Sequence, residues 1–429
     1  MPTPHQPNIL LITTDQHQAA ALSCAGNLDV RTPNLDSLAA RGVRFASAYS
    51  TFPLCTPARA SLFTGRMPHA IDAMGNGRPI PEQYRSQELG TLFQAGGYDC
   101  AYGGKWHVPR ITMEEGHGFR RIAGFNDNLL PGACIEFLRQ RRDQPFFLVA
   151  SFDNPHNICE HSRNQPLPWG EVPLAPIEEC PNLPANFAAG PYEPEAIAAY
   201  AEHAPKVRRR PAFTPDRWRL LRHVYYRLIE KVDAQIGQIL DALRETGQEG
   251  STVVLFTSDH GEMAGAHQLN QKHSLYDESA RVPFIVAGPG VRSGHVADQP
   301  VSLLDVLPTL CDVAGVSAPS DLPGLSLRPA LHGESLSRDT VVIQSLWADE
   351  INGPTAVEAR AIVSPTHKYV VHEWGENREQ LFDRTVDPGE MINLALEARY
   401  RPLFQEYRDR LRQWCLENGD RFASRIHTG

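Results

Sequence analysis

Short apolar runs alternate with helical patterns along the first two thirds of this chain. Five runs have the length and apolar character of buried strands: NILLIT (8–13), YDCAYG (98–103), FFLVAS (146–151), TVVLFTS (252–258) and PFIVAG (283–288). Between them, apolar residues recur every three or four positions at 32–42, 86–97 and 218–247. This alternation predicts an α/β fold with a large, mostly parallel sheet flanked by helices.

The pattern changes after residue 339. Three runs at 340–347, 358–364 and 367–374 favour antiparallel strands, and 401–418 favours a helix. We therefore expect a main α/β domain over 1–339 and a smaller α+β subdomain over 340–429. Residues 155–215 are rich in proline and lack periodicity, so we expect a surface insertion that covers part of a site.

Composition narrows the class of protein. The net charge of −9 argues against a nucleic-acid binder. No apolar stretch is long enough to cross a membrane. The N-terminus lacks the features of a secretory signal, and the eight cysteines contain no CxxC pair. We therefore expect reduced thiols and a cytoplasmic location. Nothing in the sequence indicates an oligomeric state.

The stretch LCTPARASLFTGR (54–66) places Cys55 at the start of a short helix. Pro57 suits the first turn, and Gly65 is a natural stop. A helix N-terminus favours negative charge, which would stabilise a thiolate or an anionic substrate. A buried structural cysteine is the alternative, and this stretch alone leaves both interpretations open.

Polar residues follow four of the predicted strands. Each alone could be an ordinary loop residue. The carboxyl ends of parallel strands share one edge of a sheet, so together they indicate a ligand site. The residues are Asp15, Gln16, Lys105, His107, Asp153, His156, Asp259 and His260.

These side chains suit a metal ion and an anion. Asp15, Asp259 and His260 offer the oxygen and imidazole ligands of Ca²⁺, Mg²⁺ or Mn²⁺. Further positive charge or donors come from Arg59, Lys105, His107 and Lys272. A cation ringed by such groups fits an ester of a tetrahedral oxyanion.

In these residues the chain resembles the type I sulfatases of the alkaline-phosphatase-like superfamily. CTPARASLFTGR matches the C-x-P-x-R signature of that family and its trailing T-G-R. Similar stretches extend over nearly the whole chain: NILLITTDQ, TPNLDSLAARGVRF, GYDCAYGGKWH, SDHGEMAGAHQLNQKHSLYDESARVPFIV and EQLFDRTVDPGEMINLA.

The resemblance implies that a dedicated maturation enzyme oxidises Cys55 to formylglycine (3-oxoalanine). One hydroxyl of the hydrated aldehyde would attack sulfur, and the second would later expel sulfate. The formylglycine oxygen, Asp15, Asp259 and His260 would bind one divalent metal ion.

The resemblance also implies roles for the surrounding residues. Arg59 would support the nucleophile, and Lys105 and His107 would contact the hydrate and the sulfate. His107 is a candidate base, His156 would assist the leaving oxygen and Lys272 would bind a sulfate oxygen. Asn76 is a candidate substrate contact, with a turn residue as the alternative.

Two positions depart from the commonest family pattern. Gln16 stands where many sulfatases carry an acidic residue, and His260 where many carry Asn. Both resemble the branch of choline sulfatase and the phosphonate monoester hydrolases, and the expected metal is Ca²⁺, with Mn²⁺ or Mg²⁺ as alternatives. The pair Lys105 and His107 is more typical of sulfatases. We therefore expect a small sugar or alkyl sulfate as substrate, with phosphonate monoesters or phosphodiesters second and an inactive binding homologue third.

Overall fold

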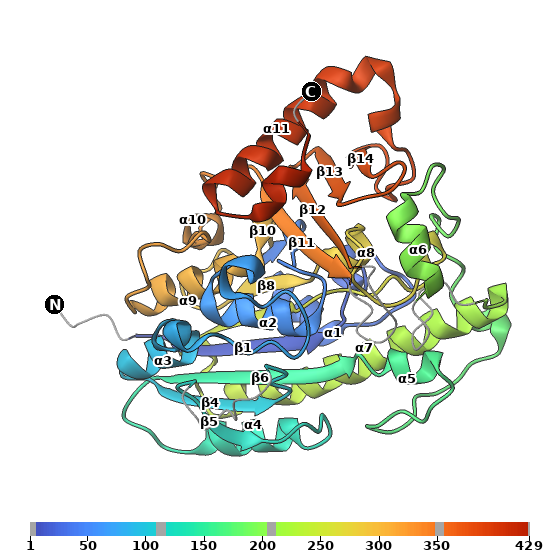
Figure 1. Ribbon diagram of the computed structural model, residues 1–429. Coiled ribbons are helices and arrows are strands. Elements are labelled where there is room, and N and C mark those ends of the chain that lie inside the picture. The colour runs from blue at the N-terminus through green and yellow to red at the C-terminus, as the bar shows by residue number, and fades with distance from the viewer. Residues whose placement is uncertain (1–5, 109–116, 204–211, 348–355, 428–429) are drawn as a thin grey trace.

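A single eight-stranded sheet forms the centre of the molecule (Figure 1). The structure, a computed structural model, describes residues 6–108, 117–203, 212–347 and 356–427. In spatial order the strands are β5 (Arg120–Ala123), β4 (Asp99–Gly104), β6 (Phe146–Pro155), β1 (Asn8–Asp15), β7 (Thr252–Ser258), β8 (Phe284–Ala287), β2 (Gly42–Phe45) and β9 (His295–Ala297). All five strands expected from the sequence are present.

Five adjacent strands, from β5 to β7, run parallel. The next strand, β8, runs antiparallel to both β7 and β2. The segment after β7 therefore stays at the carboxyl edge of the sheet, and the chain enters β8 from that edge. The sheet is mixed but mostly parallel, as the sequence predicts.

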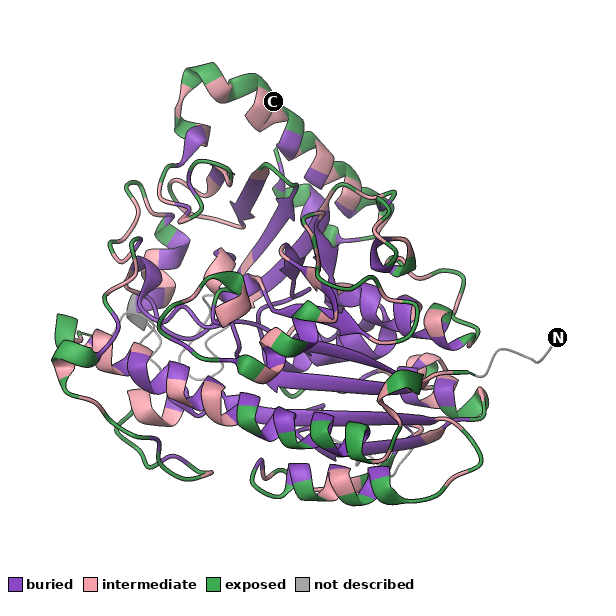
Figure 2. Ribbon diagram, turned by 180° about the vertical axis from the view of Figure 1, so that it is seen from behind, coloured by how far each residue is buried: buried purple, intermediate pink, exposed green. Residues whose placement is uncertain are grey.

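Helices cover both faces of this sheet. One face carries α1 (Pro33–Ala40), α4 (Leu130–Arg139) and α7 (Pro215–Glu245), and the other carries α2 (Cys55–Thr64), α3 (Leu89–Ala95) and α9 (Val306–Ala314). In β1, Ile9 and Leu11 pack toward α2, whereas Leu10 and Ile12 pack toward α7. Burial of both faces explains why the strands read as continuous apolar runs. Figure 2 shows these buried strands behind helices whose outer sides are exposed.

The C-terminal part forms a second, antiparallel sheet of four strands. They are β11 (Val341–Trp347), β12 (Val357–Val363), β13 (His367–His372) and β14 (Glu379–Asp383). The sequence predicts the first three and the helix α11 (Arg401–Glu417), but not β14. In Figure 1 this sheet and α11 form the upper part of the molecule.

The small sheet has two buried faces. One face packs under α11, where Val342 and Ile362 share a core with Leu411. The opposite face packs against the segment 263–280, where Ile343 shares a core with Met263 and Leu275. Because the second sheet shares this core with the catalytic part, a domain boundary at residue 339 stays a prediction.

The remaining elements are short. They are β3 (Ala48–Tyr49), β10 (Val301–Ser302), α5 (Ile158–Ser162), α6 (Glu195–His203), α8 (Asp277–Ala280) and α10 (Arg328–Leu331). The proline-rich segment contains α5, which contacts α7, and α6, whose residues Ala196 and Ile197 join the core beneath the small sheet.

A buried ion cluster joins α8 to the small sheet. Lys368 of β13 is fully buried, and its Nζ lies 2.9 Å from Asp277 Oδ1 and 2.7 Å from Glu390 Oε1. Burial raises the pKa of Glu390 to about 7 despite the nearby Lys368. Removal of the lysine would leave two buried carboxylates without their main partner.

We predict that Lys368→Ala lowers the free energy of unfolding by about 3 kcal/mol, the cost of leaving a buried charge uncompensated. The loss should be smaller at pH 5 than at pH 8, because a protonated Glu390 buries no charge. Denaturant titration at both pH values measures this. Arg399→Ala, which removes an exposed ion pair with Glu397, is the control and should cost little. Equal stability of Lys368→Ala and wild type would contradict the role of the cluster.

Candidate active site

The carboxyl edge of the large sheet gathers the polar residues that follow its strands. Asp15 ends β1, and Asp259 and His260 directly follow β7. Lys105 follows β4, and Asp153 lies near the carboxyl end of β6. All five are buried. The parallel register of β4, β6, β1 and β7 brings them together, as the sequence predicts.

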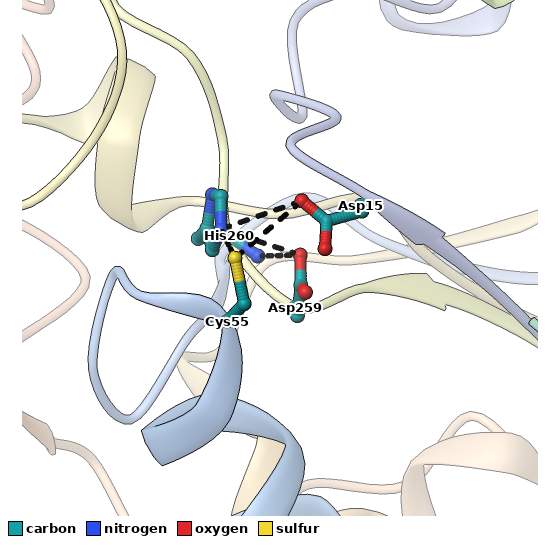
Figure 3. A group of neighbouring side chains, drawn as sticks. All are labelled: Asp15, Cys55, Asp259 and His260. Atoms are coloured by element: carbon teal, nitrogen blue, oxygen red, sulfur yellow. Dashed lines mark hydrogen bonds and ion pairs between the residues drawn. The ribbon is translucent and has the colours of Figure 1, made fainter. Parts of the chain in front are cut away.

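Three of these side chains and Cys55 form a compact donor group (Figure 3). One ligand atom each from Asp15, Cys55, Asp259 and His260 lies within 4.8 Å of the others. Cys55 Sγ lies 3.2 Å from His260 Nε2 and 3.7 Å from Asp15 Oδ1. His260 Nε2 lies 3.6 Å from Asp15 Oδ1 and 3.7 Å from Asp259 Oδ1.

The tautomer of His260 suits a ligand role. Its Nδ1 lies 3.0 Å from the carbonyl oxygen of Gly261, and this contact assigns the ring proton to Nδ1. The other ring nitrogen, Nε2, faces the two carboxylates and the thiol. A backbone carbonyl that fixes the tautomer is the usual support for a metal-binding imidazole.

Cys55 is the first residue of helix α2. The preceding Leu54 is extended, and the helix ends at Gly65 in the left-handed conformation (φ 65°). The sequence predicts both ends. The backbone N–H of Thr56 donates to Asn76 Oδ1 at 3.1 Å, so Asn76 satisfies an unpaired donor of the first helical turn.

The surroundings of Cys55 bear on the choice between a reactive and a structural thiol. Lys272 Nζ lies 3.3 Å from Sγ. Burial and Asp15 oppose ionisation, but Lys272, His260 and Lys105 outweigh them and lower the pKa of Cys55 well below its usual range. Structural buried cysteines show the opposite shift, so these surroundings favour ionisation of the thiol.

Arg59 links the two carboxylates from one turn further along α2. Its Nε donates to Asp259 Oδ2 at 2.9 Å and its guanidinium reaches Asp15 Oδ2 at 3.3 Å. Burial and the charge of Asp15 still raise the pKa of Asp259 to about 6. Two carboxylates that resist simultaneous ionisation accommodate a divalent cation readily, because the cation stabilises both charges.

Lys105 connects this group to β6. Burial opposes its charge, but its Nζ lies 2.7 Å from Asp15 Oδ2 and 3.0 Å from Asp153 Oδ1, and the two carboxylates raise the pKa of Lys105. Asp127 in turn accepts the backbone N–H groups of Asp153 and Asn154, both at 2.8 Å. Sequence reasoning noted Asp153 without a role and missed Asp127, which follows no strand and carries no local signal.

Contacts of Lys272 and of the next residue fix the position of this lysine. Its Nζ donates to Gln16 Oε1 at 2.8 Å, and Gln16 Nε2 donates to Glu262. The next residue, His273, donates its backbone N–H to Pro53 and accepts hydrogen bonds from Ser345 and Trp347 of β11. The side-chain carbonyl of Gln16 thus lies on Lys272. Sequence reasoning missed Glu262.

The two histidines differ in position. His156 follows β6, is half-buried and contacts Cys55, and burial together with Lys105 and Lys272 lowers its pKa. His107 is exposed, and its backbone carbonyl accepts a hydrogen bond from Thr56 Oγ1 at 2.8 Å. Among the described residues, no hydrogen bond joins the His107 imidazole to the donor group.

Comparison with known proteins identifies the class. The Sulfatase family model matches residues 7–131 and 126–316, and a model described as N-sulphoglucosamine sulphohydrolase, C-terminal, matches 265–417. The chain belongs to the sulfatase family and is an enzyme of the sulfuric ester hydrolase class.

Two of its relatives are sulfatases named for what they act on. A Delta 4,5-hexuronate-2-O-sulfatase of Bacteroides thetaiotaomicron is 31% identical over 98% of this chain and 91% of its own length. An Ulvan-active sulfatase of Formosa agariphila is 30% identical over 98% of this chain and 83% of its own length.

Solved structures agree with the fold. A 2-O GAG sulfatase superimposes with a TM-score of 0.85 at 29% identity, covering 99% of this chain and 97% of its own. A phosphonate monoester hydrolase of Agrobacterium radiobacter gives 0.78 at 25% identity, covering 96% of each chain. In the part of the chain that the structure describes, no helix is both long and apolar enough to span a membrane.

We predict that Asp259→Asn weakens metal binding by more than about 100-fold, since loss of an outer partner of a metal site already costs roughly 10–100-fold. Purified protein is loaded with Ca²⁺ or Mn²⁺, dialysed, and its metal content measured by mass spectrometry. Asp153→Asn, a buried aspartate at the same edge outside the donor group, is the control and should keep most of its metal. Wild-type occupancy in Asp259→Asn would place the ion elsewhere.

Proposed function

We propose that this sulfatase hydrolyses sulfate monoesters of sugars after Cys55 has been converted to formylglycine. One observation carries the proposal: an ionisable thiol at a helix N-terminus lies within a group of metal donors and beside a lysine. The hydrated aldehyde at position 55 would supply one hydroxyl to attack sulfur and a second to release sulfate.

The donor chemistry fits one divalent metal ion. Asp15, Asp259, His260 and the oxygen at position 55 would hold it. We propose Ca²⁺, with Mn²⁺ and Mg²⁺ as alternatives, because two carboxylates supply hard oxygen ligands. The ion would polarise the hydroxyl at position 55 and the ester sulfate.

The basic residues of the chain hold the anionic groups in place. Arg59 fixes the relative position of Asp15 and Asp259 through its two contacts. Lys105, directly after β4, and Lys272, in the segment between β7 and α8, both lie near the position of the nucleophile, and both would stabilise charge on the equatorial sulfate oxygens.

His156 is the residue we propose for the leaving group. It contacts Cys55 and is half-buried. A positioned imidazole there would hold a proton against the departing alkoxide oxygen. His107, which is exposed, stays a candidate base and a candidate contact of the hydrate and the sulfate. Asn76 stays a candidate substrate contact, and its side chain also caps the first turn of α2.

The relatives guide our proposal for the organic part of the substrate. The named relatives act on a hexuronate and on ulvan, and one solved structure, 22% identical, holds D-glucosamine-2-N,6-O-disulfate. A sulfated sugar is therefore our proposed substrate class. Phosphonate monoesters are the second candidate, because a hydrolase of that class shares the fold. A maturation enzyme as partner and a cytoplasmic location belong to the same proposal.

We predict that Cys55→Ala abolishes sulfate release, because it removes the nucleophile. Ion chromatography of sulfate from a panel of sulfated sugars, alkyl sulfates and phosphonates measures the activity. Peptide mass spectrometry of active wild type should show the aldehyde at position 55. Cys159→Ala, which removes a second buried thiol near the site, is the control and should retain activity. Full activity of Cys55→Ala would refute the mechanism.

His156→Ala should damage turnover of a sugar or alkyl sulfate far more than turnover of an activated aryl sulfate. A phenolate leaves without a proton, whereas an alkoxide depends on acid assistance, typically worth about 10²–10⁴-fold. Lys272→Ala is the comparison and should slow both substrates alike. The test compares kcat for the two ester types in each variant. If His156→Ala lowered kcat equally for both, the leaving-group role of His156 would be refuted.

A further inference from the structure

Two aromatic side chains lie beside the buried ammonium group of Lys105. Phe125, in the connection between β5 and α4, has its ring centroid 5.6 Å from Lys105 Nζ. Trp169, from the proline-rich segment, meets Phe125 edge to face, with ring centroids 5.7 Å apart and planes at 88°. Since Lys105 also contacts Asp15, this aromatic pair borders the donor group.

Trp169 is fixed in place by polar contacts. Its indole Nε1 donates to Asp153 Oδ2 at 3.0 Å, and the other oxygen of Asp153 accepts from Lys105. Its backbone carbonyl accepts hydrogen bonds from Asn128 and from Lys231 of α7. The indole is therefore held against the site before any ligand binds, and a preorganised side chain loses little entropy on binding.

Phe125 leaves a large apolar face open. Its side chain is 49% exposed, and Trp169 beside it is half-buried. The two rings are perpendicular, and the ammonium group of Lys105 lies over the ring of Phe125. Ligand sites commonly combine aromatic walls with a few polar groups in this way.

We propose that Phe125 and Trp169 form the subsite for the sugar ring of the substrate. The inference rests on the proposed function and names the residues that select its organic part. A pyranose ring presents a flat face of C–H groups, which packs against an aromatic ring while its hydroxyls remain in water. An acyclic alkyl chain has no such face and gains less from the pair.

Binding is tested in a Cys55→Ala background, so that turnover does not interfere. Titration calorimetry compares D-glucosamine-2-N,6-O-disulfate and a 2-O-sulfated Δ4,5-hexuronate with butyl sulfate. Phe125→Ala and Trp169→Ala should each weaken binding of a ring sulfate by about fivefold to tenfold. Binding of butyl sulfate should change less than twofold. Trp169→Phe, which keeps an aromatic face without the indole N–H, should retain most of the ring binding.

Leu129→Ala and Leu174→Ala are matched controls, because both are exposed apolar residues of the same two segments, at 66% and 67%. They should leave all affinities unchanged. Equal losses for ring and acyclic sulfates, or no loss, would overturn the subsite. A Trp169→Phe loss as large as that of Trp169→Ala would also overturn it, since the residue would then act through Asp153.

The outcome is separable from that of the proposed function. Sulfate release is measured on the protein with residue 55 intact. Failure to release sulfate from any ester contradicts the proposed function, while the binding pattern of the Cys55→Ala variants still decides the subsite.

Discussion

The contacts of Arg59 hold the active site together. One guanidinium reaches Asp259, Asp15, the hydroxyl of Ser151 and the carbonyl of Lys105, and so joins helix α2 to the ends of β7, β1, β6 and β4. All of these groups are buried, where an unpaired charge is very costly. The position of α2, and of Cys55 at its start, therefore depends on the same charges that form the donor group.

The small C-terminal sheet supports this site from the opposite side. Ser345 and Trp347 of β11 both donate to the carbonyl of His273 at 2.7 Å, directly after Lys272. The N–H of His273 donates to Pro53, two residues before Cys55. The sheet contributes no side chain to the donor group, yet it fixes the backbone that carries Lys272 next to the thiol. The small sheet therefore supports the active site as well as forming a sheet of its own.

Much of this arrangement could be predicted from the sequence, because local patterns report burial and strand ends. The apolar runs locate β1, β4, β6 and β7, and the residues that follow them meet at one edge. The direction of β8 depends on where the intervening segment lies, which no local pattern records. The five-residue strand β14 is too short for a clear alternation.

Contacts between side chains that lie far apart in the sequence could not be predicted either. Gln16 accepts from Lys272, 256 residues later, and its neutral amide has no local property that would show this. Trp169 lies in a segment without periodicity, so its contact with Asp153 gave no signal. His107 is adjacent in sequence to the site but is exposed, which spacing alone could not reveal.

The complete burial of α2 bears on when Cys55 would be oxidised. Every residue from Cys55 to Thr64 is buried, including Pro57 and Arg59, and Cys55 is only 1% exposed. Under the proposed function, an enzyme that recognises this stretch and oxidises its thiol would have no access to it in the folded protein. Oxidation and folding would then compete for the same nascent chain. Molecules that fold first would keep their cysteine, so the active fraction of a preparation would record the relative rates of the two processes during synthesis.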